Sequence, residues 1–202
     1  MRFTFPETKQ AHIVIDARPQ GGYVKILPDK RRIVGYNDEQ GASSLTNTRG
    51  YFVVEFNKPF KDYGTWNMNQ TARGADEEKS EDERIGAYIS FSVDEGEQVM
   101  AKGAVSFIGT GKARSLLEKE IPSWEFDKVK QEVRTAWNDA LSRIQVQGGT
   151  KDQKKLFYTG LYNAMRHPRS ATEDGEYWSA YDGQVHQVDG WEYYSFDEGF
   201  WD

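Results

Sequence analysis

Two hydrophobic patterns divide the chain, and one replaces the other near Gly111. Before that residue, Val, Ile, Tyr and Phe recur at every second position in short runs bounded by Gly, Pro, Asn and Asp. Alternation of this kind is typical of half-buried strands in an antiparallel sheet or sandwich. It predicts strands at 11–17, 22–27, 31–36, 51–56, 85–93 and 99–109.

The segment 67–84 interrupts these runs with polar and charged residues that show no periodicity. Such a segment is typical of a surface loop or a flexible insertion, and its Asp and Glu side chains are expected to be solvated. We therefore expect no functional site there.

After Gly111 the apolar residues recur at steps of three and four, which indicates amphipathic helices. The first is expected within 123–144, with an apolar face made of Phe126, Val129, Val133, Trp137, Leu141 and Ile144.

A second helix is expected at 151–167. Thr150 and Gln153 have the spacing of a capping box at its start, and Pro168 stops it. Its expected buried residues are Leu156, Leu161 and Met165. The chain beyond Pro168 is rich in Gly, Asp, Tyr and Trp, so irregular structure is expected there.

Composition narrows the classes of function. A net charge of −6 argues against nucleic acid as a partner, and the absence of cysteine excludes disulfides, thiolate zinc sites and a cysteine nucleophile. No apolar run reaches the ~18 residues of a membrane span, and no signal peptide is recognisable after Met1. The aromatic content of 14% suits either a β-rich core or stacking on sugar rings.

Common catalytic motifs are absent from the sequence. His12, His167 and His186 have no G-x-S-x-G sequence nearby that would indicate a serine triad. There is no H-E-x-x-H, Walker loop or G-x-G-x-x-G. Residues 174–183, DGEYWSAYDG, have acidic residues like a calcium loop but lack its spacing and its terminal Glu, so a turn-rich loop is expected.

The last twelve residues, WEYYSFDEGFWD, hold six aromatic and four acidic side chains. Asp197 and Glu198 are adjacent, which suits a pair of catalytic carboxylates poorly because neighbouring side chains on a loop point apart. Asp202 beside Trp201 suits sugar binding, with the carboxylate accepting hydrogen bonds from hydroxyls and the indole packing on the ring. A helix start with an N-terminal acidic residue is the other interpretation of these two residues.

Several segments, taken in order, resemble one enzyme family. They are RFTFPE (2–7), IVIDA, IVGY, YFVVEFNKPF (51–60), VSFIGTGKARSLLEKEIPSWEFDKV (105–129), AWNDALSRIQVQG (136–148), KKLFYTGLYNAMRHPRSATEDGEYWSAYDGQVH (154–186) and GFWD (199–202). This order is similar to glycoside hydrolase family 92, the calcium-dependent exo-acting α-mannosidases.

The resemblance implies a mainly β chain with α-helices. Residues 1–111 would be a portion of an antiparallel β-sandwich and 112–149 linker helices. Residues 150–202 would be the first helix and loop of an (α/α)6 catalytic barrel. The chain would thus be a fragment with its catalytic acid and base, and the ligands of its Ca²⁺, outside it. Within it, the resemblance assigns a substrate-binding role to Asp202, because the Asp of the family's WD motif contacts mannose hydroxyls.

The expected function is that of part of an inverting α-mannosidase, periplasmic or secreted, whose partner is a mannose-containing glycan. The isolated chain is expected to be inactive and to self-associate through apolar faces that the missing parts would cover. The alternatives are a non-catalytic carbohydrate-binding or scaffolding module, and a β-plus-helix domain unrelated to sugars.

Overall fold

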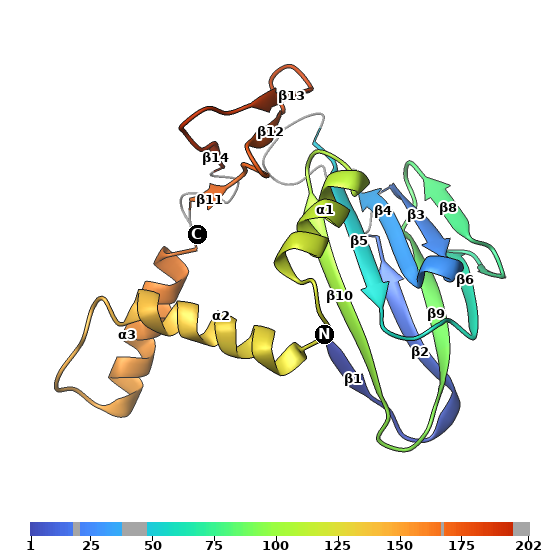
Figure 1. Cartoon of the computed structure of the whole chain (residues 1–202), viewed down its shortest axis with the longest axis horizontal. Coiled ribbons are helices and arrows are strands. Elements are labelled where there is room, and N and C mark those ends of the chain that lie inside the picture. Colours follow the sequence, from blue (N-terminus) through green and yellow to red (C-terminus); the bar gives the residue numbers. More distant parts are fainter. Residues whose placement is uncertain (18–20, 38–47, 167, 196–202) are drawn as a thin grey trace.

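The computed structural model describes residues 1–17, 21–37, 48–166 and 168–195. Two antiparallel sheets form a sandwich, followed by three helices and a small β region (Figure 1). The first sheet has the order β1-β10-β5-β4-β3-β8, with β1 at Arg2–Thr4, β10 at Gln98–Ser106, β5 at Gly50–Phe56, β4 at Arg32–Asn37, β3 at Gly22–Leu27 and β8 at Glu77–Ser80. The second has the order β2-β9-β6-β7, with β2 at Thr8–Asp16, β9 at Ile85–Val93, β6 at Asp62–Asn67 and β7 at Thr71–Arg73.

The six predicted strands are confirmed as β2, β3, β4, β5, β9 and β10. Their alternation works as expected, because one set of side chains meets the facing sheet and the other set points outward. In β3, for example, Val24 and Ile26 are buried whereas Tyr23 and Lys25 are partly exposed. A one-turn 3-10 helix at Pro28–Lys30 joins β3 to β4.

The prediction of a loop at 67–84 is wrong, since β7 and β8 lie within it. β8 is an edge strand that pairs with β3, and charged side chains are common on edges because they discourage further pairing. Its Glu78 accepts a hydrogen bond from the buried Thr65 hydroxyl of β6 at 3.2 Å, so a carboxylate takes the place of an apolar residue.

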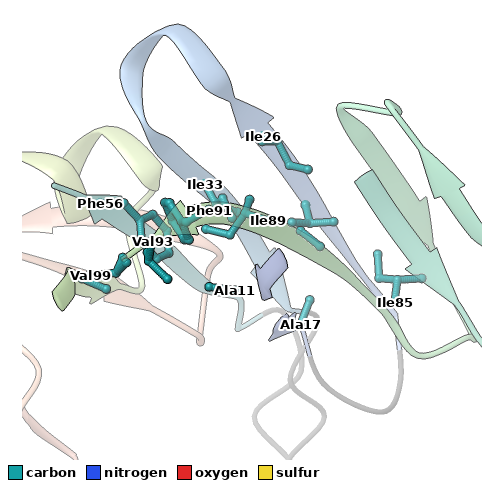
Figure 2. Packing of buried hydrophobic residues seen from close by; sticks show 13 residues of the cluster. Ala11, Ala17, Ile26, Ile33, Phe56, Ile85, Ile89, Phe91, Val93 and Val99 are labelled. Carbon is teal, nitrogen blue, oxygen red and sulfur yellow. The ribbon is translucent and has the colours of Figure 1, made fainter. Parts of the chain in front are cut away.

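The sandwich core lies between the two sheets (Figure 2). Phe56 from the first sheet and Phe91 from the second have ring centroids 5.9 Å apart, and both meet Phe60 of the β5–β6 connection. The buried side chains of this core are Ala11, Ala17, Val24, Ile26, Ile33, Phe56, Ile85, Ala87, Ile89, Phe91, Val93, Val99 and Ala101.

Helix α1 (Thr110–Glu120) packs on the outer face of the first sheet. Its two buried residues, Ala113 and Leu117, are four positions apart and contact Val53 of β5. This helix begins two residues before the expected start of the linker helices at 112. The second sheet's outer face is therefore on the side of the molecule opposite α1 (Figure 1).

Helices α2 (Phe126–Leu141) and α3 (Lys151–Ala164) fall where the periodicity predicts them. The capping box is also confirmed: the Gln153 amide donates to the Thr150 hydroxyl at 3.2 Å, and the Thr150 amide donates to the Gln153 side-chain oxygen at 2.8 Å. The helices meet at Trp137 and Tyr162, whose rings are 4.5 Å apart.

The predicted burial of the α3 face is wrong, because neither α2 nor α3 has a fully buried residue. Leu156 is 75% exposed and Met165 is 37% exposed. An apolar groove of about 760 Å³ separates α2 from the sandwich, and its lining includes Trp124, Val129 and Val133.

The region after Pro168 is not irregular as predicted. It contains β11 (Arg169–Ser170) paired with β14 (Tyr194–Ser195), and β12 (Glu176–Ser179) paired with β13 (Gln184–Gln187). Residues 174–183, expected to be a turn-rich loop, contribute the whole of β12 and the turn of this β12–β13 hairpin. We call residues 169–195 the aromatic hairpin.

Candidate functional site

The aromatic hairpin is fastened to the sandwich by three acidic residues from one short turn. Glu173, Asp174 and Glu176 lie at the start of β12, and each reaches a partner in β10 or α1 or just between them. Asp174 adopts a positive φ of 52°, and Gly175 follows at 79°, so the chain turns sharply here. Asp tolerates this left-handed conformation better than most residues, which explains its use at this point.

Glu173 makes the most buried of these attachments. Its carboxylate accepts a hydrogen bond from the hydroxyl of Ser106 and another from the Phe107 amide at 2.7 Å. Ser106 is only 3% exposed, and its oxygen also accepts the amides of Ile108 and Gly109 at 2.9 and 3.2 Å. A single hydroxyl therefore joins the end of β10, the approach to α1 and the hairpin.

The other two carboxylates pair with lysines on α1. Lys112 donates to Glu176 at 2.6 Å, and Lys119 donates to Asp174. The hydrogen bond from Lys119 holds the pKa of the Asp174 carboxyl below its ordinary value, and that from Lys112 does the same to the pKa of Glu176. Both carboxylates are thus ionised anchors, whereas a catalytic acid needs a raised pKa.

Four ring side chains, which we call the aromatic cluster, cover one part of the hairpin: Tyr177, His186, Trp191 and Tyr193. Tyr177 stacks on Tyr193 with centroids 4.6 Å apart and an interplanar angle of 17°, and it also stacks on His186 at 5.4 Å. Trp191 meets Tyr177 edge-on at 5.5 Å and remains 50% exposed. The cluster provides a rigid aromatic surface with an open side.

A serine, an aspartate and a histidine meet in the same hairpin, but in an order unsuited to nucleophilic catalysis. Asp182 accepts from Ser179 and lies 2.8 Å from Nε2 of His186, and the Ser179 hydrogen bond in particular lowers the pKa of the Asp182 carboxyl. A serine triad needs the histidine in the centre, where it can take the serine proton. Here the carboxylate is in the centre, so this group braces the hairpin turn.

The two predicted substrate-binding residues, Trp201 and Asp202, lie outside the described residues, as do Asp197, Glu198 and His167. Their roles stay predictions. The described chain ends at Ser195 in β14, whose pairing with β11 holds the segment that leads to them. A further hydrogen bond, from the Tyr193 amide to the Thr172 hydroxyl at 2.8 Å, secures the same segment.

Metal-binding groups are not assembled in the described part of the chain, where no three His, Asp, Glu or Cys residues come together as a possible ion site. The two aspartates of the calcium-like sequence, Asp174 and Asp182, point to different partners, Lys119 and His186.

Sequence reasoning missed Ser106 and Glu173, the residues that position the hairpin. Neither has a motif of its own, because their contact spans 67 residues of sequence. The only available signal was the pair of segments that contain them, both of which belong to the family resemblance.

Comparison with known proteins now decides the family. The glycosyl hydrolase family 92 N-terminal domain matches residues 1–106, and the glycosyl hydrolase family 92 catalytic domain matches residues 112–202. The chain belongs to glycoside hydrolase family 92. The sandwich therefore corresponds to the family's N-terminal domain, and the aromatic hairpin lies within the match to its catalytic domain.

Solved structures of family 92 enzymes are similar to this chain over part of their own length. It is similar to a family 92 inverting mannosidase from Bacteroides thetaiotaomicron, with 31% identity, a TM-score of 0.88 and coverage of 99% of this chain but 27% of the other. A second α-mannosidase from the same organism shares the fold at 24% identity and a TM-score of 0.80, over 96% of this chain and 27% of that one.

A curated relative, described as an uncharacterized secreted glycosidase from Arthroderma benhamiae, is 30% identical over 103 residues, which are 48% of this chain and 13% of the relative. The family 92 chain thus spans a minor part of each of these proteins. No helix within its described ranges is long and apolar enough to cross a membrane.

Proposed function

We propose that this family 92 chain is part of an enzyme that removes terminal α-linked mannose from glycans by inverting hydrolysis. The observation that carries the proposal is the 31% identity to an inverting mannosidase over 99% of the chain, at a TM-score of 0.88. The name of the curated relative supports export of the parent protein, by which we mean the complete protein that contains this chain.

The proposed role of this chain is to shape and support a sugar pocket. The Asp202 carboxylate would accept hydrogen bonds from two vicinal hydroxyls of mannose while the Trp201 indole packs on the ring. The aromatic cluster supports this role, since it stiffens the segment that ends a few residues before them.

Catalytic acid and base are assigned to other parts of the parent protein. The hairpin carboxylates Asp174, Glu176 and Asp182 all have lowered pKa values and fixed partners, so they suit anchoring and not proton transfer. We therefore propose that the isolated chain does not hydrolyse mannosides.

Calcium is likewise assigned to other parts of the parent protein. The described residues do not fit a calcium site, because they bring together no group of three oxygen-donating acidic side chains.

The decisive experiment compares the parent protein with this chain on an α-linked mannobiose. The parent protein is expected to release mannose, and proton NMR should show β-mannose as the first anomer, as inversion requires. Asp202→Asn should lower kcat/KM by about 100-fold, since it removes charge-assisted hydrogen bonds to the sugar. Asp189→Asn, an exposed position in the same region, should leave it unchanged.

Three results would contradict the proposal. Release of α-mannose first would exclude inversion, and an unaltered kcat/KM in Asp202→Asn would remove that residue from the pocket. Glycan binding by the parent protein without any hydrolysis would favour the alternative of a non-catalytic carbohydrate-binding module.

A further inference from the structure

A polar hollow of about 330 Å³ lies on the outer face of the second sheet. The side chains that line it from β9, β6 and β2 alternate with core residues, so they point away from the first sheet. Helix α1 packs on the outer face of the first sheet, and the aromatic hairpin contacts α1 and the end of β10, so this hollow is on the opposite side of the sandwich (Figure 1). Its lining residues are Lys9, Gln10, His12, Lys61, Asp62, Arg73, Tyr88 and Ser90.

The hollow is positively charged, whereas the whole chain is negatively charged. The chain carries a net charge of −6, whereas the hollow gathers Lys9, Lys61 and Arg73 against one carboxylate, that of Asp62. His12 also lines the hollow. Clustered cations in a recess attract anions more strongly than the same charges spread over a surface.

Arg73 is oriented as an anion-binding group. Its Nε lies 2.8 Å from the Asp62 carboxylate, which in turn accepts the Tyr63 amide at 3.0 Å. No hydrogen bond joins the terminal Nη atoms of Arg73 to another residue in the described parts of the chain. Those two atoms form the planar fork that recognises phosphate, sulfate or carboxylate groups.

Tyr88 gives the hollow an aromatic wall. It pairs with Gly64 across β9 and β6, and a side chain at Gly64 would come within 2.7 Å of the Tyr88 ring and hydroxyl. The Tyr88 ring therefore covers Gly64, where a side chain would collide with it, and it meets the His12 ring edge-on with centroids 6.4 Å apart. Tyr88 is half-buried and lines the hollow, so the accessible part of its ring can pack on the CH face of a sugar ring.

The rim of the hollow is built by an irregularity in β2. The register with β9 shifts between Thr8 and Ala11, so Lys9 and Gln10 lie in a bulge. Bulges redirect side chains and are common beside binding sites. Lys61, just before β6, donates to the Lys9 carbonyl at 3.1 Å and so joins the two sides of this rim.

We propose that this hollow is a second carbohydrate-binding site, one that takes a sugar ring bearing an anionic group. Tyr88 packs on the ring, while Lys9, Lys61 and Arg73 bind the phosphate, sulfate or carboxylate. The site lies away from the aromatic hairpin, so it would hold a charged branch of a glycan and perform no chemistry on it. It does not depend on the proposed mannosidase function, because binding to the chain can be measured without hydrolysis.

The test is calorimetric titration of the 202-residue chain with mannose 6-phosphate, mannose, inorganic phosphate and glucuronate. Mannose 6-phosphate is expected to bind at least about tenfold more tightly than mannose or phosphate alone, because ring and anion are recognised together. Its affinity should fall as salt is raised. Binding of glucuronate in addition would show that a carboxylate serves as well as a phosphate.

Variants of the hollow connect the binding to these residues. The double variant Lys9→Gln, Lys61→Gln should weaken mannose 6-phosphate binding about tenfold or more, and Tyr88→Leu about fivefold. Lys79→Gln, which removes one exposed charge from β8 of the other sheet, should leave the affinity unchanged. Circular dichroism of each variant confirms that the sandwich is folded.

Four outcomes would overturn the proposal: no binding of any anionic sugar at millimolar concentration, equal binding of mannose, equal binding of inorganic phosphate, or equal weakening by Lys79→Gln. If Tyr88→Leu fails to fold, the affinity of the lysine double variant tests the proposal, because that variant alters exposed side chains only.

Discussion

The strands of the sandwich and the helices α2 and α3 each have the apolar periodicity of their type of element. Only the sandwich, however, buries its apolar side chains. Ile33, Val53 and Ile89 are fully buried between layers, whereas α2 and α3 contain no buried residue. Each sheet has a partner layer, while the helices meet each other at little more than the Trp137–Tyr162 contact. Amphipathic pattern therefore predicts the element, and the partner layer decides whether its apolar face is buried.

The largest expected effect is a contrast between core and helix truncations. Phe91→Ala should lower the free energy of unfolding by about 3–5 kcal/mol, because it empties a site 1% exposed between Phe56 and Phe60. Leu156→Ala, at a site 75% exposed, should change it by about 0.5 kcal/mol or less. Urea unfolding followed by circular dichroism measures both. Equal losses would show that α3 is packed against another part of the protein in solution.

A smaller effect is expected at the joint between sandwich and hairpin. Glu173→Ala leaves the buried Ser106 hydroxyl without its acceptor and should weaken the attachment by about 1–3 kcal/mol. Hydrogen exchange should then accelerate at the Phe107 amide, which Glu173 also binds.

Glu192→Ala provides the matched control for that joint, because Glu192 is exposed in the same hairpin. The same acceleration in both variants would mean that Glu173 does not fasten the hairpin.

The exposed helical faces should make the chain self-associate. Sedimentation velocity is expected to show species heavier than the monomer, and Leu156→Lys should lower the association constant by about tenfold, because it places a charge in an apolar contact. Gln131→Lys adds the same charge to an exposed position of α2 away from Phe126, Val133 and Trp137 and should have little effect. A monomer at all concentrations would show that the two helices tolerate their exposure.

The smallest effect concerns acid pH. The pKa values of Asp174 and Glu176 are lowered by their lysine partners, so folding stabilises the ionised forms. Their contribution is complete above the ordinary pKa values of 3.8 and 4.5, and is lost as pH falls below these through the lowered values.

The aromatic hairpin contains Trp178 and Trp191, so its detachment can be followed by tryptophan fluorescence. The fluorescence should change only at a pH below the ordinary pKa values of Asp174 and Glu176, 3.8 and 4.5. The change should move toward higher pH in Lys112→Gln. A transition that stays at the same pH in that variant would show that Lys112 does not bind Glu176 in solution.

The sequence predicted strands well where one face is purely apolar, and poorly where a buried position is polar. β6 was missed because Thr65 points inward and Gly64 and Trp66 point outward, so no apolar alternation is visible. β8 was missed because its inward Glu78 serves as a hydrogen-bond acceptor for Thr65. Such positions obey the hydrogen-bonding requirement of buried polar groups and not the hydrophobic pattern.

The candidate site was predicted only in part, for a related reason. The density of aromatic and acidic residues marked its location, but the contact of Glu173 with Ser106 depends on the fold bringing distant segments together. The spacing of residues within a short segment cannot predict a contact between residues 67 positions apart. Family resemblance supplied what spacing could not, since both residues lie in segments that it covers.

The short pairing of β1 with β10 has a practical consequence for anyone who expresses this protein. The Met1 amino group donates to the Ala101 carbonyl at 2.6 Å, and the Ala101 amide donates back to Met1. In antiparallel pairing, the backbone groups of Gly103 and Val105 face the same edge, and Val105 is 74% exposed. A purification tag fused ahead of Met1 would thus lie beside these backbone groups of β10 and pair with them as a strand. A tag at the opposite end avoids that edge of β10, so the two placements should be compared before any binding or activity measurement.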